Sequence, residues 1–353
     1  MPERPDPSTR VELLAANAAA MDALDTLLAR HTAAELTTAH DAAGWTAKDH
    51  LAHLTAWLRS VLEPARDGIS RWEALGVSEA VFAARHEDDF FRINEQIRRR
   101  HAGEALGAGR KTLRETFEGA QAYLHEASDA ELQRPVVAGD PADGEVTFFQ
   151  LFDSDGWRHV NEHCGYIAII LGEAGAGKES SDRSTPATMD ALLAANDAAW
   201  AALHALIARY PESELTTAHD PAGWTSKDHL AHLAAWERGV LHVLRDGWPE
   251  WQGIGVSEDV YATRYDDDLF AINEVIRRQH ADRTLDDVLI ELQAVHEAMQ
   301  ETIRQLGEEG LRRPVGDFRH DDTDFPVIDW IPGDACDHYD KHRGYIAIIL
   351  GDA

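Results

Sequence analysis

Histidine has the clearest chemical potential in this chain, because a neutral imidazole is both a metal ligand and an acid–base group near neutral pH. The 353 residues include 19 histidines. His159 and His163 stand four residues apart, so on a helix both rings project from one face, the spacing that two ligands of one ion need. His53 lies one helical turn before Trp57 in another apolar segment. In a helical bundle these three imidazoles can converge and leave positions open for water or substrate.

The candidate histidines occur twice, because the sequence is a tandem duplication. A constant offset maps GWTAKDHLAHLTAW at 44–57 onto GWTSKDHLAHLAAW at 223–236, and GYIAIILG at 165–172 onto 344–351. Histidine recurs at six sites, which are His40/His219, His50/His229, His53/His232, His101/His280, His159/His338 and His163/His342. The second candidate triad is therefore His232, His338 and His342. A recent duplication also preserves neutral residues, so recurrence selects candidates without proving a role.

Apolar periodicity predicts an all-α fold. Each copy contains runs with helical spacing and few strand signals, and a Thr46/Asp49 capping pattern marks the start of the second helix. The helices expected in the first copy are about 11–30, the segment after Thr46, 78–100, 111–127 and 150–171. This order predicts two up-and-down four-helix bundles, each with an extra inserted helix. The predicted domains are 1–172 and 187–353, joined by a flexible Gly/Ser-rich linker at 173–186.

Composition excludes several classes of partner. Lys and Arg total 33 against 63 Asp and Glu, a net charge of −30 that repels nucleic acid and anionic membranes. The apolar runs are far shorter than the roughly 20 residues of a membrane helix. Two cysteines and no signal-like apolar stretch at the N-terminus favour a cytoplasmic location. We expect a small-molecule ligand, and two copies that pair as a pseudo-dimer within one chain.

Other residues near the triads have both a functional and a plain structural interpretation. Asp155 and Asp334, four residues before the His pair, are candidate hydrogen-bond acceptors, a fourth ligand, or simply acids that favour a helix N-terminus. Glu95 and Glu274 are candidate general bases or solvated helix residues. The remaining candidates line the pocket or belong to the core, and they are His50, Trp57, Asn94, His229, Trp236 and Asn273.

The segments GWTxKDHLAHLxAW, INExI and GDACDHYDKHRGYI resemble the DinB-like (DinB/YfiT) superfamily of four-helix bundles, most closely its ClbS/DfsB-type branch. The resemblance covers both copies except the N-terminal tail and the linker. It implies a divalent metal, zinc or nickel, held by one His of the second helix and the His-x-x-x-His pair of the last. By position these are the two triads named above, and both are complete.

The resemblance leaves three functions open. The first is a metal-dependent hydrolase or thiol transferase that activates water or a low-molecular-weight thiol to open or substitute a small electrophile, in detoxification or self-resistance. The second is a non-catalytic protein that sequesters a toxic natural product in a Trp-lined pocket. The third is a stress protein with a structural metal. Sequence differences beside the triads, such as Cys164 opposite Arg343, suggest that the two copies do not accept the same ligand.

Overall fold

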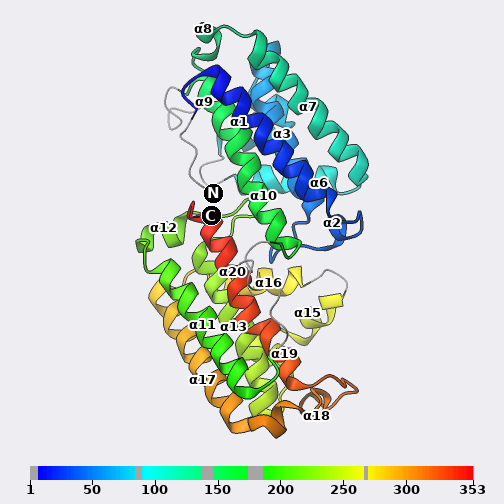
Figure 1. The fold of residues 1–353 in the computed structure, drawn as a ribbon, viewed down its shortest axis with the longest axis vertical. Coiled ribbons are helices and arrows are strands. Elements are labelled where there is room, and N and C mark those ends of the chain that lie inside the picture. The colour runs from blue at the N-terminus through cyan, green and yellow to red at the C-terminus, as the bar shows by residue number, and fades with distance from the viewer. Residues whose placement is uncertain (1–6, 85–89, 137–145, 174–185, 266–268, 353) are drawn as a thin grey trace. The chain divides into compact units, whose positions relative to one another are not determined.

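The computed structural model describes residues 7–84, 90–136, 146–173, 186–265 and 269–352. It divides into two compact units, the first mainly Met1–Asp41 with Trp45–Leu171 and the second mainly Gly172–Asp220 with Trp224–Ala353. The described residues form helices and isolated β-bridges but no strand (Figure 1). The prediction of an all-α fold in two tandem halves is confirmed. The predicted linker lies outside the described residues except at its ends.

Four long helices form the bundle of the first unit. Helix α3 packs on α7 and α10, and α1 packs on the same two helices, so the four close a ring (Figure 1). The elements of this unit are α1 (Arg10–Ala29), α2 (Glu35–Thr38), α3 (Ala47–Asp67), α4 (Arg71–Leu75), α5 (Glu79–Ala83), α6 (Phe91–His101), α7 (Leu106–Glu126), α8 (Asp129–Leu132), α9 (Phe148–Phe152), a π-helical turn (Asp153–Arg158) and α10 (His159–Ile170).

The second unit repeats this arrangement with α13 and α11 each packed on α17 and α20. Its elements are α11 (Met189–Ile207), α12 (Glu212–Thr217), α13 (Ser226–Asp246), α14 (Glu250–Ile254), α15 (Glu258–Ala262), a 3₁₀ turn (Thr263–Tyr265), α16 (Phe270–His280), α17 (Leu285–Leu311), α18 (Gly316–Arg319), α19 (Val327–Asp334) and α20 (Cys336–Ile349).

The predicted last helix at 150–171 is wrong as a continuous element. The backbone of Gly156 is not helical (φ −98°, ψ −114°), and it separates α9 from α10. A Cβ atom at this position would come too close to Oδ1 of Asn17 on α1, so a larger residue would displace the Asn17 side chain. Ala335 breaks the second copy at the equivalent position, between α19 and α20. Each His pair therefore lies on a new helix that begins just before it.

The predicted helix at 78–100 is also wrong as one element, because α5 and α6 are separate helices. Phe90 precedes α6 with a left-handed backbone (φ 65°), and Leu269 before α16 does the same (φ 72°). A non-glycine residue in this region cannot continue a right-handed helix. The prediction of extra helical structure between the second and third long helices nevertheless holds, since α4, α5 and α6 all lie there.

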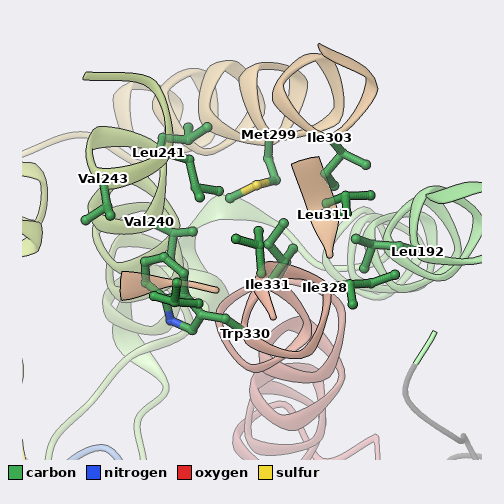
Figure 2. Packing of buried hydrophobic residues seen from close by; sticks show 14 of the residues in the cluster. Leu192, Val240, Leu241, Val243, Met299, Ile303, Leu311, Ile328, Trp330 and Ile331 are labelled. Atoms are coloured by element: carbon green, nitrogen blue, oxygen red, sulfur yellow. The ribbon is translucent and has the colours of Figure 1, made fainter. Parts of the chain in front are cut away.

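Apolar side chains from all four long helices fill each bundle. Figure 2 shows this core in the second unit, where Val240 and Leu241 of α13 face Met299 and Ile303 of α17 and Ile331 of α19. These residues are nearly or fully buried, so the hydrophobic effect stabilises the arrangement. Among the described residues, no helix is both long and apolar enough to cross a membrane.

One buried polar pair interrupts the core of the second unit. Glu237 of α13 and Tyr339 of α20 are fully buried, and the Tyr339 hydroxyl donates a hydrogen bond to Oε2 of Glu237. Burial raises the pKa of Glu237 to about 8, although this hydrogen bond acts in the opposite direction. Leu58 and Val160 occupy the equivalent positions in the first unit. The Glu237 carboxyl group is therefore mostly protonated and uncharged in the core at neutral pH.

We predict that the second unit loses stability as pH rises from about 4.5, where an exposed Glu ionises, to about 8, where Glu237 ionises in the folded state. Below this window both states are protonated and the penalty is absent. Glu237→Gln should remove the Glu237 contribution, so that its stability relative to wild type rises by about 3–4 kcal/mol between pH 5 and pH 8. Urea unfolding followed by circular dichroism measures this difference in stability. Glu301→Gln is the control, because Glu301 is an exposed residue of α17. A pH-independent difference would contradict it.

Candidate metal centre

Three imidazoles of the first unit converge on one point. Nε2 of His53, on α3, lies 2.9 Å from Nε2 of His159, on α10. Nε2 of His163 lies 3.1 Å from the same atom of His159. One ligand nitrogen from each residue falls within 4.8 Å of the others. His53 and His163 are buried, whereas His159 is half-buried and gives the cluster its exposed side.

The second unit repeats the cluster with His232 on α13 and His338 and His342 on α20. The Nε2 atoms of His232 and His338 are 3.1 Å apart, and the ring centroids of His232 and His342 are 4.6 Å apart. His338 is again the half-buried member. The predicted convergence of a second-helix His with a last-helix His pair therefore exists in both copies.

A capping box sets where α3 begins, and hence which face carries His50 and His53. The backbone N–H and the hydroxyl of Thr46 donate to Oδ2 of Asp49 at 2.9 and 2.7 Å, while Thr46 Oγ1 accepts the Asp49 N–H. This reciprocal cap satisfies backbone donors at the helix start. His50 follows directly, so the helix register at the site is fixed within one turn. Thr225 and Asp228 form the same cap in the second unit.

A hydrogen bond behind the first cluster joins His163 to His50, beside the carboxylate of Asp41. Nδ1 of His163 lies 2.6 Å from Nδ1 of buried His50, and Nε2 of His50 lies 3.9 Å from a carboxylate oxygen of Asp41. The other oxygen of Asp41 accepts the N–H of Trp45 at 2.8 Å, which holds the carboxylate in place. The negative charge favours the His50 tautomer with its proton on Nε2. His50 Nδ1 then accepts a hydrogen bond from the N–H at Nδ1 of His163, and the lone pair of His163 Nε2 is left for the cluster.

The second unit carries the same relay. Nδ1 of His342 lies 2.8 Å from Nδ1 of His229, and Nε2 of His229 lies 3.6 Å from Asp220. Asp220 in turn accepts the N–H of Trp224 at 2.8 Å. The two copies thus repeat the same contacts between the paired histidines and the aspartate. A ligating imidazole normally binds a carboxylate or another acceptor through its second nitrogen, and this arrangement extends that pattern by one ring.

Burial keeps the clustered imidazoles neutral. Burial, together with the positive charge that His159 would carry, lowers the pKa of His50 to about 3, and burial lowers the pKa of His159 to about 4. Burial and neighbouring imidazoles also hold the pKa values of His53 and His163 well below the ordinary range. In the second unit the pKa of His338 falls to about 3. Neutral imidazole is the form that binds a metal.

The donor set fits a divalent cation. Nε2 of His159 is in contact with two other ring nitrogens, and neutral imidazoles cannot supply a separate proton for each contact. Nitrogens bound to one zinc ion at about 2.0–2.1 Å in a tetrahedron lie roughly 3.3 Å apart, close to the observed spacing. Nδ1 of His53 is buried and has no hydrogen-bond partner among the described residues, so this ring lacks the outer acceptor that His163 has in His50. Both triads can therefore hold a metal ion.

Indole rings flank the cluster. Trp45 approaches His53 edge-on with ring centroids 5.5 Å apart, and Trp57 lies 6.1 Å from His53 on its other side. The Trp57 Nε1 donates to Oδ1 of Asn94 at 3.1 Å, so α6 fixes this indole. Trp236 and Asn273 form the same bond at 3.0 Å in the second unit. Both indoles are almost fully buried, so they exclude water from one side of the triad.

The two predicted general bases, Glu95 and Glu274, form ion pairs with arginine side chains. Arg98 and Arg99 bind the Glu95 carboxylate at 2.8 and 2.5 Å, and Arg277 and Arg278 bind Glu274 similarly. Burial alone would raise the pKa of Glu95, but the hydrogen bonds and charges of the arginines lower it overall. Neither glutamate belongs to the groups of converging ligands. Their role as bases stays a prediction, and the pairing makes them weak proton acceptors.

Asp155 and Asp334 are not on the helices that carry the His pairs. The break at Gly156 removes the predicted register, and Asp155 instead accepts a hydrogen bond from Arg71 at 2.6 Å. Burial raises the pKa of Asp155 and Arg71 opposes it. Asp334 has Glu250 at the position of Arg71, and burial followed by the Glu250 charge raises its pKa to about 8. Neither residue joins the converging ligands, and their catalytic role stays a prediction.

Sequence reasoning missed two aspartates behind the site and one buried acid in the core. Asp41 and Asp220 were not considered as candidates. They are nevertheless the same residue in both copies, at the end of the repeated segment ELTTAHD at 35–41 and 214–220. The buried acid Glu237 was missed because only one copy has it. Recurrence would have found the aspartates, whereas no pattern within either copy indicates that Glu237 lies in the core.

The sequence model of the DinB superfamily matches residues 16–167 and 195–346. The chain therefore belongs to the DinB superfamily, as a tandem duplication of its helical bundle. No curated protein and no solved structure matches the chain. The resemblance to the superfamily is confirmed, and the ClbS/DfsB-type branch stays a prediction.

We predict that the full chain binds one divalent ion in each copy. Zinc-loaded protein should carry two ions by native mass spectrometry, His53→Ala should carry one, and the double variant His53→Ala/His232→Ala none, because two imidazoles rarely hold zinc alone. His101→Ala is the matched control, since His101 also recurs in both copies but lies outside the triad. Full zinc loading of the double variant would contradict the assignment.

We predict that His50, which lies behind the ligands, raises the affinity of the first site for zinc. In a His232→Ala background, which leaves only the first site, His50→Phe should weaken zinc binding by about 10–100-fold because His163 loses the acceptor that fixes its tautomer. His50→Gln should recover part of the affinity, because a carboxamide oxygen accepts the same proton. Competition with a chromophoric chelator measures both. Unchanged affinity in His50→Phe would refute the relay.

Proposed function

We propose that this DinB-superfamily protein is a metal-dependent catalyst that opens or substitutes a small electrophile with water or a low-molecular-weight thiol. The observation that carries the proposal is the convergence of three imidazole nitrogens in each copy, with one half-buried ligand toward solvent. Three protein ligands leave positions open, which is typical of catalytic rather than structural sites. Zinc and nickel are the ions expected from the family.

A divalent ion at this site would supply Lewis acidity and lower the pKa of a water or thiol. The chain contributes the rest. Asp41 and His50 orient His163, the indoles of Trp45 and Trp57 keep one side dry, and Asn94 holds Trp57. A dry wall strengthens electrostatic interactions beside it.

The nucleophile of the proposal comes from outside the chain. Burial raises the pKa of Cys164 to about 12, so at neutral pH its thiol is protonated and unreactive. Cys336 is fully buried in the core beside α11 and α13. A soluble thiol or water, reaching the cluster past His159 or His338, therefore suits the site better. With an epoxide as electrophile, a thiol forms a C–S bond, the C–O bond breaks, and the sulfur proton passes to oxygen.

The alternative is sequestration without turnover, in the manner of a self-protection protein. The buried indoles beside His53 and His232 favour it, because aromatic faces bind flat apolar compounds. On this alternative the metal or the imidazoles would hold a toxic compound without changing it. A detoxification or self-resistance role is compatible with either version.

We predict that metal-loaded protein converts styrene oxide to product in the presence of bacillithiol or mycothiol, or to the diol with water alone. Mass spectrometry should find more than one product molecule per site, and the His53→Ala/His232→Ala variant should lose at least about 100-fold of the rate. His101→Ala should retain the rate. If the protein retains one molecule of unaltered electrophile per site, the result would favour sequestration over catalysis. If the electrophile is neither converted nor retained, the result would contradict both functions.

A further inference from the structure

The two copies differ in charge on the side of the triad that faces solvent. His159 and His338 are the half-buried ligands, and the residue three positions after each of them is exposed. This residue is Glu162 on α10 of the first copy and Lys341 on α20 of the second. Residues three apart on a helix are neighbours on its surface. A carboxylate therefore borders the exposed ligand of the first triad, and an ammonium group borders that of the second.

The positive charge of Lys341 acts on the whole second triad. Burial, followed by the charges of Lys341 and His229, lowers the pKa of His338 to about 3. The Lys341 charge also contributes to the lowered pKa values of His232 and His342, after burial and the neighbouring imidazoles. Coulomb interactions weaken with distance, so a charge that influences all three rings lies close to the point where they converge.

The carboxylates near His338 do not cancel this charge. Asp337 directly precedes His338, and adjacent residues of a helix point about 100° apart. Asp340 accepts a hydrogen bond from Arg343 at 3.4 Å. Burial and a neighbouring glutamate raise the pKa of Asp334 to about 8, so this carboxyl is mostly uncharged at neutral pH. Among the described residues, the lysine is the one charge outside the histidines that shifts the pKa values of the second triad.

The first triad has no equivalent cation. Burial and the neighbouring imidazoles lower the pKa values of its three ligands, and no lysine or arginine among the described residues contributes. Arg158 and Arg71 bind Asp153 and Asp155 at 2.7 and 2.6 Å, so each arginine forms a neutral pair. Glu162 adds a negative charge on the exposed side. An anion that approaches the first triad is therefore repelled where one that approaches the second is attracted.

We propose that Lys341 makes the second metal centre selective for a thiol that carries a carboxylate, and that Glu162 makes the first centre disfavour the same ligand. This inference rests on the proposed function, because it assumes an ion with an open position on the exposed side of each triad. The thiol binds as thiolate and gives its proton to solvent. Its carboxylate then faces the Lys341 ammonium group. The two copies thus accept ligands of different charge.

Titration of cobalt-loaded protein with two thiols tests the proposal, because thiolate binding to cobalt gives a near-ultraviolet absorption band that needs no turnover. His53→Ala leaves only the second site, and His232→Ala leaves only the first. The probes are 3-mercaptopropionate and its neutral methyl ester. The preference for the acid over the ester should be at least about tenfold greater at the second site than at the first. High salt should reduce this difference, because the lysine is exposed.

Exchange of the two charged residues should exchange the preference. Lys341→Glu in the His53→Ala chain should weaken binding of 3-mercaptopropionate at least about tenfold. Glu162→Lys in the His232→Ala chain should strengthen it by a similar factor. Binding of the methyl ester should change little in either variant, because the ester carries no charge. The comparison of the two unaltered centres requires neither charge variant, so the test remains valid if one of them does not fold.

Two matched variants control for net charge. Arg304→Glu on α17 and Glu118→Lys on α7 change exposed residues by the same charge and should leave both affinities unchanged. Equal preference for the acid at both sites, or a preference that survives Lys341→Glu, would overturn this inference and leave the metal centres in place. If neither thiol binds the cobalt-loaded protein, the open position is wrong, and the proposed function fails together with this inference.

Discussion

The hydrogen bond between the Nδ1 atoms of His50 and His163 is the interaction on which the site depends. It commits the outer nitrogen of His163 to a protein partner and leaves the inner nitrogen free to ligate. Asp41 sets the direction of this relay from one end, and its carboxylate is held by the backbone of Trp45. Without the hydrogen bond between His50 and His163, nothing would orient the lone pairs of three closely packed neutral imidazoles toward one point. The equivalent bond between His229 and His342 shows that the constraint belongs to the repeated unit.

Duplication has left that constraint untouched while the cores around it have diverged. The second bundle carries Glu237 and Tyr339 where the first has Leu58 and Val160. It also has Trp200, stacked on His296, where the first has Met21. A buried neutral acid costs stability at neutral pH. The second copy thus carries a local cost that the first lacks, and this cost lies outside the histidine cluster.

The sequence predicted the helical class, the duplication and the residues of both triads, because these depend on periodicity and spacing alone. It failed where a contact distant in sequence decides the local backbone. The backbone leaves helical geometry at Gly156 and at its counterpart Ala335, and no pattern within 150–171 predicts this break. The same break removed the expected register of Asp155, which pairs with Arg71 instead. His50 was ambiguous for a related reason, since its partner lies on a helix more than a hundred residues away.

The most direct test of the account is a crystal structure of the zinc-loaded full chain with anomalous scattering data collected at the zinc edge. The account predicts two anomalous peaks per chain, each about 2.0–2.1 Å from three Nε2 atoms, with a position open on the side of His159 or His338. It also predicts that Nδ1 of His163 and His342 remain bonded to His50 and His229. Peaks on surface carboxylates, or rings turned so that Nδ1 binds zinc, would contradict it.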